Sequence, residues 1–382
     1  MPSVMREAIR ELARSDSCNS EREQADHRRA QSARSRSRLH RSEFTFDLSD
    51  GILLNCINMN STRREFLTAS SAAIAGVATG CTTMTSPEER AAQWSHWHSP
   101  GQIYDLGWID AHVHVWTPDT LAYPLAEGYT KQRMAPPSYT PEELFAQCRP
   151  QGVSRIVLIQ MSFYKYDNSY MLAMMRQHPG VFGGVAIIDE NSPDVRNQMQ
   201  SLAARGVRGF RLYTNKENSA GWATSAGMKE MWKTGAELGM AMCCLANPDA
   251  LPNVAKMCTA FPDTPVVIDH FARIGVSGSV NQPDLDQLLA LSKFKNTYVK
   301  TSAFYALGKK AAPYTDLGPM IRQLRDAFSA KRLMWATDCP FQSEKGHTYG
   351  ASIELIRDRL DFLTEADRQW MLRKTAESVF FA

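Results

Sequence analysis

Eight apolar runs rich in β-branched residues, separated by segments with helical patterns, constrain the fold of this chain more than any other feature. The runs are Trp108–Trp116, Arg155–Phe163, Phe182–Asp189, Val207–Tyr213, Met240–Asn247, Pro265–Phe271, Thr297–Phe304 and Arg332–Asp338. This alternation predicts strand–helix units around a parallel sheet. Eight such units within residues 107–382 have the size of a (β/α)8 barrel. We therefore predict an α/β fold, a single-domain TIM barrel with its functional site at the C-terminal ends of the strands.

A doubly wound open sheet is the alternative fold for the same pattern. Its nucleotide-binding members carry a glycine-rich loop directly after a strand. Neither G-x-G-x-x-G nor G-x-x-x-x-G-K-[ST] follows any of the runs. The sequence therefore favours the barrel.

The composition argues against several classes of protein. The chain has 382 residues, with 43 Lys and Arg against 40 Asp and Glu, a balance unlike that of a protein that coats nucleic acid. It lacks the run of about 18 apolar residues that each span of a multi-span membrane protein requires. The 8 cysteines show no repeated C-x-x-C spacing, so neither a zinc ribbon nor a disulfide scaffold is indicated. An enzyme with an N-terminal extension fits best.

Residues 1–58 differ in composition from the rest of the chain. Their stretch 28–41 is rich in Arg and Ser and has no acidic residue. Such a segment has too little apolar surface to offset the entropy of ordering it, so we predict a disordered extension. The alternative interpretation is a mis-assigned start, with the true one at Met59.

Residues 59–81 resemble a twin-arginine export signal. Arg63-Arg64-Glu65-Phe66-Leu67 precedes a short, weakly apolar stretch that is too short to span a bilayer. The resemblance predicts export to the periplasm or cell envelope; if the signal is not used, the protein is cytoplasmic. Cys81 is a candidate lipid attachment site, and a membrane is an expected partner only if it is lipidated. Residues 82–106 are predicted to be a linker.

Histidine and aspartate side chains gather at the ends of three predicted strands. His112 and His114 alternate with apolar residues in the first run, so both imidazoles lie on one face of that strand. His270 closes the sixth run and Asp338 the eighth, where Pro340 stops the ladder of hydrogen bonds. Taken singly, each is as consistent with a cap, a turn or a structural histidine. Because strand ends meet at one rim of a barrel, together they predict an active site.

The sequence around these residues resembles the amidohydrolase-related superfamily, and within it the sugar-lactonase and 2-pyrone-4,6-dicarboxylate lactonase branch. The motifs are Asp-Ala-His-Val-His-Val-Trp at 110–116, Gln-Met-Ser-Phe-Tyr at 160–164, Gly-Phe-Arg-Leu at 209–212, Asp-His at 269–270, Tyr-Val-Lys-Thr-Ser at 298–302 and Trp-Ala-Thr-Asp-Cys-Pro at 335–340. The resemblance covers residues 108–380. It implies a hydrolase that opens a cyclic ester, a lactone of a sugar acid or of a pyrone dicarboxylate.

The resemblance also implies catalytic roles. Asp338 would be the general base that takes a proton from the attacking water. Three histidines would polarise the lactone carbonyl and stabilise the oxyanion, namely His112, His114 and His270. The expected partner is an anionic small-molecule lactone, with no nucleic acid, and the sequence predicts no oligomeric state.

Arg211, at the end of the fourth run, can bind a substrate carboxylate through two hydrogen bonds. The alternative interpretation is a salt bridge to a rim acid such as Asp189 or Asp269. Other residues that can line the site are Tyr213, Tyr164, Trp116 and Arg273.

The resemblance leaves the metal content open. Many relatives hold a divalent ion with the His-x-His pair, a histidine on the fifth strand and the aspartate on the eighth. The fifth run has no histidine, and its Cys243 and Cys244 are predicted to be small buried apolar residues. We therefore expect a metal-independent hydrolase with no required cofactor. The open alternative is a weakly held zinc at His112, His114 and Asp338.

Other functions stay open at this point. The same barrel can carry a metal-dependent amidohydrolase or a nonoxidative decarboxylase. A non-catalytic envelope protein that binds sugar acids is a further alternative. Nucleic-acid binding through the Arg- and Ser-rich stretch is opposed by the near-neutral charge of the whole chain.

Overall fold

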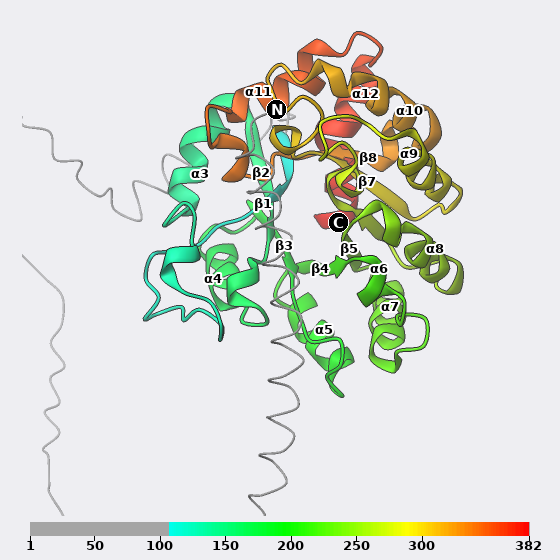
Figure 1. Cartoon of the computed structure of the whole chain (residues 1–382). Helices are drawn as coiled ribbons and strands as arrows, with labels where there is room; N and C mark the ends of the chain where they lie inside the picture. Colours follow the sequence, from blue (N-terminus) through cyan, green and yellow to red (C-terminus); the bar gives the residue numbers. More distant parts are fainter. Residues whose placement is uncertain (1–106, 382) are drawn as a thin grey trace, which may run out of the picture. The chain divides into compact units, whose positions relative to one another are not determined.

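The computed structural model describes residues 107–381, and these form a nearly closed barrel of eight parallel strands surrounded by helices (Figure 1). The strands pair in chain order: β1 Trp108–Val113, β2 Val153–Ile159, β3 Phe182–Ala186, β4 Val207–Thr214, β5 Ala241–Ala246, β6 Val266–Ile268, β7 Thr297–Thr301 and β8 Leu333–Trp335. The predicted TIM barrel is confirmed. The predictions for residues 1–58, 59–81 with Cys81, and 82–106 lie outside the described residues and stay predictions.

Helices follow the strands and cover the outside of the barrel. They are α3 Pro141–Cys148, α4 Ser169–Gln177, α5 Val195–Ala203, α6 Lys216–Ser219, α7 Ala226–Leu238, α8 Leu251–Ala260, α9 Gln282–Leu289, α10 Gly318–Phe328, α11 Tyr349–Glu354, α12 Glu365–Gln369 and α13 Thr375–Phe380. The start of α3 shows why a helix begins there: Thr140 and Glu143 cap each other's backbone N–H groups, and Pro141 occupies the first helical position. Within the described part of the chain, no helix has the length and apolarity needed to cross a membrane.

The two ends of the sheet meet through backbone hydrogen bonds just beyond β1 and β8. The N–H of Asp338 donates to the carbonyl of His112 at 2.9 Å, and the N–H of His114 donates to the carbonyl of Cys339 at 2.9 Å. These bonds place the residues that follow β8 directly beside the end of β1.

A buried carboxylate strengthens the same junction. Asp110 is fully buried, and it accepts hydrogen bonds from the backbone N–H and the hydroxyl of Thr337 and from the hydroxyl of Tyr349. Burial raises the pKa of Asp110 to about 6, although these hydrogen bonds act to lower it. Asp110 therefore ties β1 to the segment after β8 and to α11.

The interior of the barrel is closed at one end. Apolar side chains from the strands fill it, including Ile109, Val157, Val185, Val267 and Met334. From α13, Val379 and Phe380 join this cluster, and Phe380 lies against Gly183 near the start of β3. The N-terminal ends of the strands are thus covered, and the C-terminal ends remain for a site.

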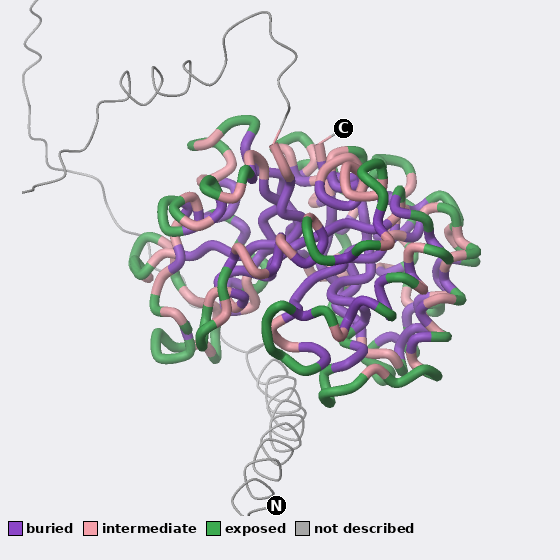
Figure 2. The backbone as a smooth tube through the Cα atoms, turned by 90° about the horizontal axis from the view of Figure 1, so that it is seen from above, coloured by how far each residue is buried: buried purple, intermediate pink, exposed green. Residues whose placement is uncertain are grey.

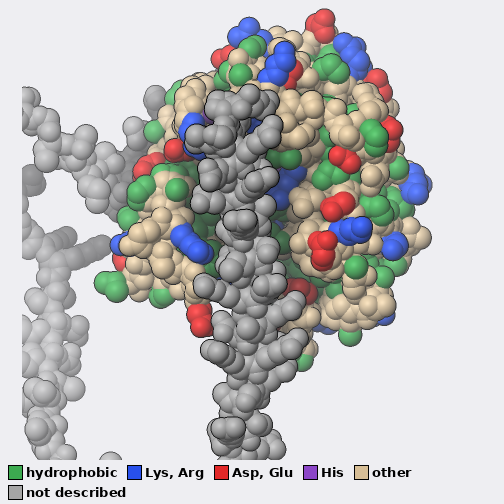
Figure 3. Space-filling model, viewed as in Figure 1, with side chains coloured by type: hydrophobic (Ala, Val, Ile, Leu, Met, Phe, Trp, Pro, Cys, Tyr) green, Lys and Arg blue, Asp and Glu red, His purple; other side chains and the backbone are tan. Residues whose placement is uncertain are grey.

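The distribution of buried and charged residues is consistent with a barrel of strands covered by helices. The strands are buried, whereas the exposed residues lie on the outer helices and loops (Figure 2). On the face shown in Figure 3, basic and acidic side chains are interspersed and do not form one large basic patch.

Candidate active site

Three imidazoles surround one oxygen of a carboxylate at the C-terminal ends of the strands. Asp338 Oδ1 lies 3.3 Å from Nε2 of His114, 3.5 Å from Nε2 of His112 and 3.8 Å from Nε2 of His270. All four side chains are buried. The structure thus brings together the four residues that the sequence placed at strand ends.

Backbone geometry sets these positions. His112 and His114 share one face because side chains alternate along β1. His270 follows β6 with a φ of 50°, and Asp338 follows β8 with a φ of 71°. Positive φ continues from His270 through residues 271–273. This left-handed conformation is strained for residues other than glycine, and folded proteins keep such strain mainly at functional sites.

An ion pair that the sequence analysis did not assign lies beneath His112. Lys300 Nζ is 3.0 Å from Asp269 Oδ1 and 3.1 Å from His112 Nδ1, and all three side chains are fully buried. Burial acts to raise the pKa of Asp269, but Lys300 and His112 outweigh it and hold that pKa well below 3.8. Asp269 and Lys300 are therefore a charged pair that contacts the His112 imidazole at Nδ1.

Each ring nitrogen of His112 faces one cation and one carboxylate. Burial, the charge of Lys300 and that of His270 lower the pKa of His112 well below 6.5, so the ring is neutral at pH 7. Lys300 contacts Nδ1, and Arg211 lies 3.2 Å from Nε2, yet both cations only donate and a neutral ring accepts at one nitrogen. A carboxylate also faces each nitrogen: Asp338 Oδ1 lies 3.5 Å from Nε2, and Asp269 Oδ1 lies 3.5 Å from Nδ1.

The other two imidazoles are also held by hydrogen bonds. His114 Nδ1 lies 2.8 Å from the carbonyl oxygen of Ile159, which only accepts, so Nδ1 carries a proton and Nε2 faces Asp338. His270 Nδ1 lies 2.8 Å from the hydroxyl of Ser302. Burial lowers the pKa of His270 to about 4, so this ring is neutral at pH 7. Each ring is thereby fixed in orientation.

Tyr305 is a site residue that the sequence analysis missed. Its hydroxyl donates to Asp338 Oδ2 at 2.7 Å, on the opposite carboxylate oxygen from the histidines. Tyr305 lies in a short 3-10 turn, Phe304–Ala306, directly after β7. The only signal in the sequence was its position just past the predicted seventh strand.

Two arginines lie close to the cluster, and neither forms an ion pair with a carboxylate of the described residues. Arg211, on β4, is buried and forms neither of the salt bridges considered, to Asp189 or to Asp269. Its guanidinium lies 5.3 Å from the ring centre of the half-exposed Tyr213. Burial and the charge of Arg211 lower the pKa of Arg273. The repulsion between these two cations favours an anion between them.

The structure does not bring Trp116 and Tyr164 to the cluster. Trp116 is fully buried, packs edge-on against Phe163 at 5.5 Å and donates from Nε1 to the carbonyl of Pro136. Tyr164 packs against Phe163 at 4.8 Å and is 3% exposed. Both residues belong to an aromatic cluster around Phe163, which reaches His114 only through Phe341, at 6.2 Å from Trp116 and 5.9 Å from His114.

The described residues include one group that can hold a metal ion: ligand atoms of His112, His270 and Asp338 lie within 4.8 Å of one another. This group contains His270, whereas the zinc site considered from the sequence contained His114. Burial raises the pKa of Cys243 to about 12 and that of Cys244 well above 9, so neither offers a thiolate ligand from β5.

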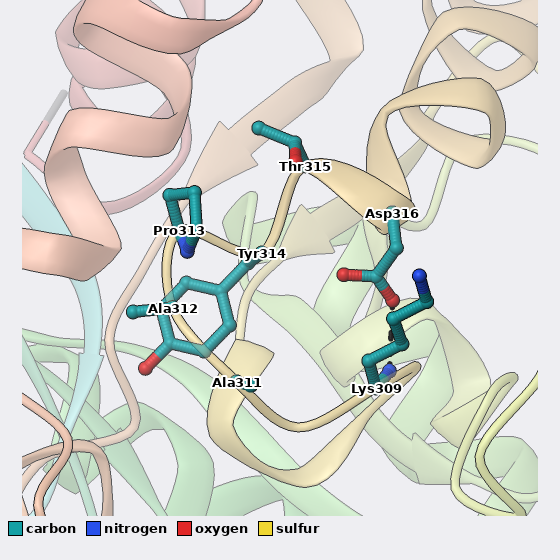
Figure 4. Close-up of a pocket in the computed structure, with 7 residues that line it drawn as sticks. All are labelled: Lys309, Ala311, Ala312, Pro313, Tyr314, Thr315 and Asp316. Carbon is teal, nitrogen blue, oxygen red and sulfur yellow. Dashed lines mark hydrogen bonds between the residues drawn. The ribbon is translucent and has the colours of Figure 1, made fainter.

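Two surface cavities lie away from this cluster. They measure about 400 and 320 Å³ and border the segment between β7 and α10 that includes Lys309 and Asp316 (Figure 4). The backbone N–H of Lys309 donates to Asp316 Oδ2 at 2.8 Å, so these groups are already paired. No histidine lines either cavity, and the candidate site remains the cluster around Asp338.

Comparison with known proteins decides the family. Residues 109–382 match the sequence model of the amidohydrolase family. The chain belongs to this family. Amidohydrolases of this type place their chemistry at the C-terminal ends of barrel strands, where the cluster around Asp338 lies.

Several relatives of this amidohydrolase act on lactones. It is 28% identical over 232 residues to the 4-sulfomuconolactone hydrolase of Rhizobium radiobacter, covering 60% of this chain and 75% of that protein. It is 27% identical over 272 residues to a 2-pyrone-4,6-dicarboxylate hydrolase of Comamonas testosteroni, covering 68% and 86%. A Pseudomonas putida crystal structure described as a 2-pyrone-4,6-dicarboxylic acid hydrolase superposes with a TM-score of 0.61 and 26% identity, covering 73% and 98%.

Proposed function

We propose that this amidohydrolase hydrolyses the lactone of a sugar acid or of a pyrone dicarboxylate. The observation that carries the proposal is the Asp338 carboxylate with three imidazoles around one of its oxygens. The names of several relatives, lactone hydrolases and a galactarolactone isomerase, support the same substrate class.

Asp338 acts as the general base. Burial alone would raise the pKa of Asp338, but His270 and a hydrogen bond with His114 outweigh it and hold this pKa below 3.8. Asp338 is therefore a carboxylate at neutral pH. Its Oδ1 takes a proton from water as the water oxygen bonds to the lactone carbonyl carbon. When the ring C–O bond breaks, the same proton passes from Asp338 to the leaving oxygen, and the product is an open-chain hydroxy acid.

The carbonyl oxygen becomes an oxyanion in this step and needs N–H donors. We assign the proton of the neutral His112 ring to Nε2, so that Nε2–H points toward Asp338 and the site while Nδ1 accepts from Lys300. His114 and His270 complete the polar surroundings of the oxyanion. Removal of one oxyanion donor in other enzymes costs about 10²–10³-fold in kcat.

We further propose that the hydrolysis needs no metal ion. The Lys300 ammonium and the Arg211 guanidinium lie 3.1 and 3.2 Å from the two ring nitrogens of His112, and both repel a divalent cation. The buried Cys243 thiol adds no anionic ligand. The second candidate function, a metal-dependent amidohydrolase or nonoxidative decarboxylase, is favoured by the grouping of His112, His270 and Asp338.

A lactone panel tests both proposals. Aldonolactones and pyrone dicarboxylates are offered to the protein, and acid release is followed with a pH indicator before and after dialysis against a chelator. We expect hydrolysis of at least one lactone at an unchanged rate after dialysis. Stoichiometric zinc by elemental analysis, with activity lost on chelation and restored by zinc, would instead establish the metal-dependent alternative.

Replacing Arg211 with methionine tests whether the substrate is anionic. Among residues 107–381 Arg211 has no carboxylate partner, so we expect it to bind an acidic group of the substrate. A charged hydrogen bond contributes about 1.5–3 kcal/mol, so KM for anionic lactones should rise by roughly 10- to 100-fold. Neutral lactones serve as the control and should keep their KM. Equal losses for both substrate classes would show a structural role instead.

A further inference from the structure

We propose that Tyr305 is a positioning residue that holds Asp338 by its Oδ2 and so presents Oδ1 alone to the attacking water. This inference rests on the proposed lactone hydrolysis. It concerns a residue outside the histidine and aspartate set, in the turn that follows β7.

The two oxygens of the Asp338 carboxylate have separate partners. The Tyr305 hydroxyl donates to Oδ2 at 2.7 Å, whereas Oδ1 faces the Nε2 atoms of His112, His114 and His270 at 3.3–3.8 Å. The terminal torsion of an aspartate is broad and roughly two-fold, so an unheld carboxylate exchanges its oxygens easily. The bond from Tyr305 breaks that symmetry and assigns one oxygen to the histidines.

Tyr305 can hold the carboxylate because its own backbone is anchored. Ala303 has a φ of 56°, which turns the chain sharply after β7. The next residue, Phe304, is fully buried and packs against Phe271 at 6.2 Å and Tyr314 at 5.9 Å. The backbone that carries Tyr305 is therefore anchored by the packing of Phe304.

This arrangement has a consequence for the reaction. The proton taken from water must arrive on Oδ1, since the phenol occupies Oδ2 throughout the cycle. The proton is then already on the side of the histidines, where the leaving oxygen is released. Loss of the phenol lets the carboxylate rotate, and small misplacements of a reacting group can cost about 10²-fold in rate.

The test compares two tyrosine-to-phenylalanine variants of the full chain. Tyr305→Phe should lower kcat by about 10- to 100-fold and leave KM within about twofold, because the phenol acts on the base and not on substrate affinity. Tyr314→Phe is the matched control. Tyr314 lies in the same segment and is buried (Figure 4), but its hydroxyl meets His347 Nδ1 at 2.7 Å and not Asp338. Its kcat should stay within about threefold of wild type.

A double-mutant cycle needs no substrate. Thermal midpoints are measured for wild type, Tyr305→Phe, Asp338→Ala and the double variant. We expect Tyr305→Phe to lower the midpoint in wild type but not in the Asp338→Ala background, because the acceptor is then absent. Additive midpoints, a KM effect without a kcat effect, or equal kcat losses in Tyr305→Phe and Tyr314→Phe would overturn the inference. A wild-type protein that hydrolyses no lactone would instead refute the proposed function, while the midpoints still decide the role of Tyr305.

Discussion

Replacement of Asp338 by asparagine is expected to lower kcat/KM for lactones by about 10²–10⁴-fold, the contribution typical of general acid–base catalysis. Asparagine has nearly the same shape and can still accept from the Tyr305 hydroxyl, but it cannot take a proton from water. It also tolerates the left-handed backbone, with a φ of 71°, that this position requires. Initial rates on the best lactone of the panel, together with the thermal midpoint, provide the measurement.

The control is Asp189→Asn. Asp189 follows β3, and among the described residues its side chain accepts hydrogen bonds only from Asn191 and makes no ion pair with the histidine cluster. Its variant should keep wild-type kinetics. If Asp338→Asn retains turnover within about tenfold of wild type, Asp338 is not the base and the mechanism proposed here is wrong.

The fold and the four central residues were readable from the sequence because both depend on strand periodicity. A period of two puts His112 and His114 on one face of β1. Parallel strands in chain order bring all C-terminal ends to one rim, which is why His270 and Asp338 join them although they lie far along the chain. Neither argument needs to know how side chains pack.

The supporting residues could not be assigned in this way, because their roles arise from packing. Lys300 lies in β7 between Val299 and Thr301, and its partner Asp269 was considered only as a rim acid. Tyr305 reaches Asp338 because Ala303 adopts a left-handed φ. No sequence pattern predicts that turn. The packing of Trp116 against Phe163 and Phe341 likewise depends on how side chains meet after β1, which hydrophobicity alone does not show.

The largest effect on stability is expected for Lys300→Met. Lys300 and Asp269 are both fully buried, and their ion pair supports His112 from below. Removing one partner of a buried pair leaves an uncompensated charge, which typically costs 3–5 kcal/mol, so the free energy of unfolding should fall by about that amount. Denaturant unfolding followed by circular dichroism measures it. Removal of both charges in Lys300→Met/Asp269→Asn should recover most of the loss, because no unpaired buried charge then remains.

A surface ion pair supplies the matched control for this prediction. Arg322 Nη2 and Asp361 Oδ1 lie 3.7 Å apart, with side chains 51% and 95% exposed. Arg322→Met should therefore change the free energy of unfolding by less than about 1 kcal/mol. A Lys300→Met variant that loses no more than Arg322→Met would show that water or a neighbouring group already neutralises Asp269. In that case the buried pair would not determine the orientation of His112. Another contact would then have to hold the His112 Nε2–H that we assign to the oxyanion.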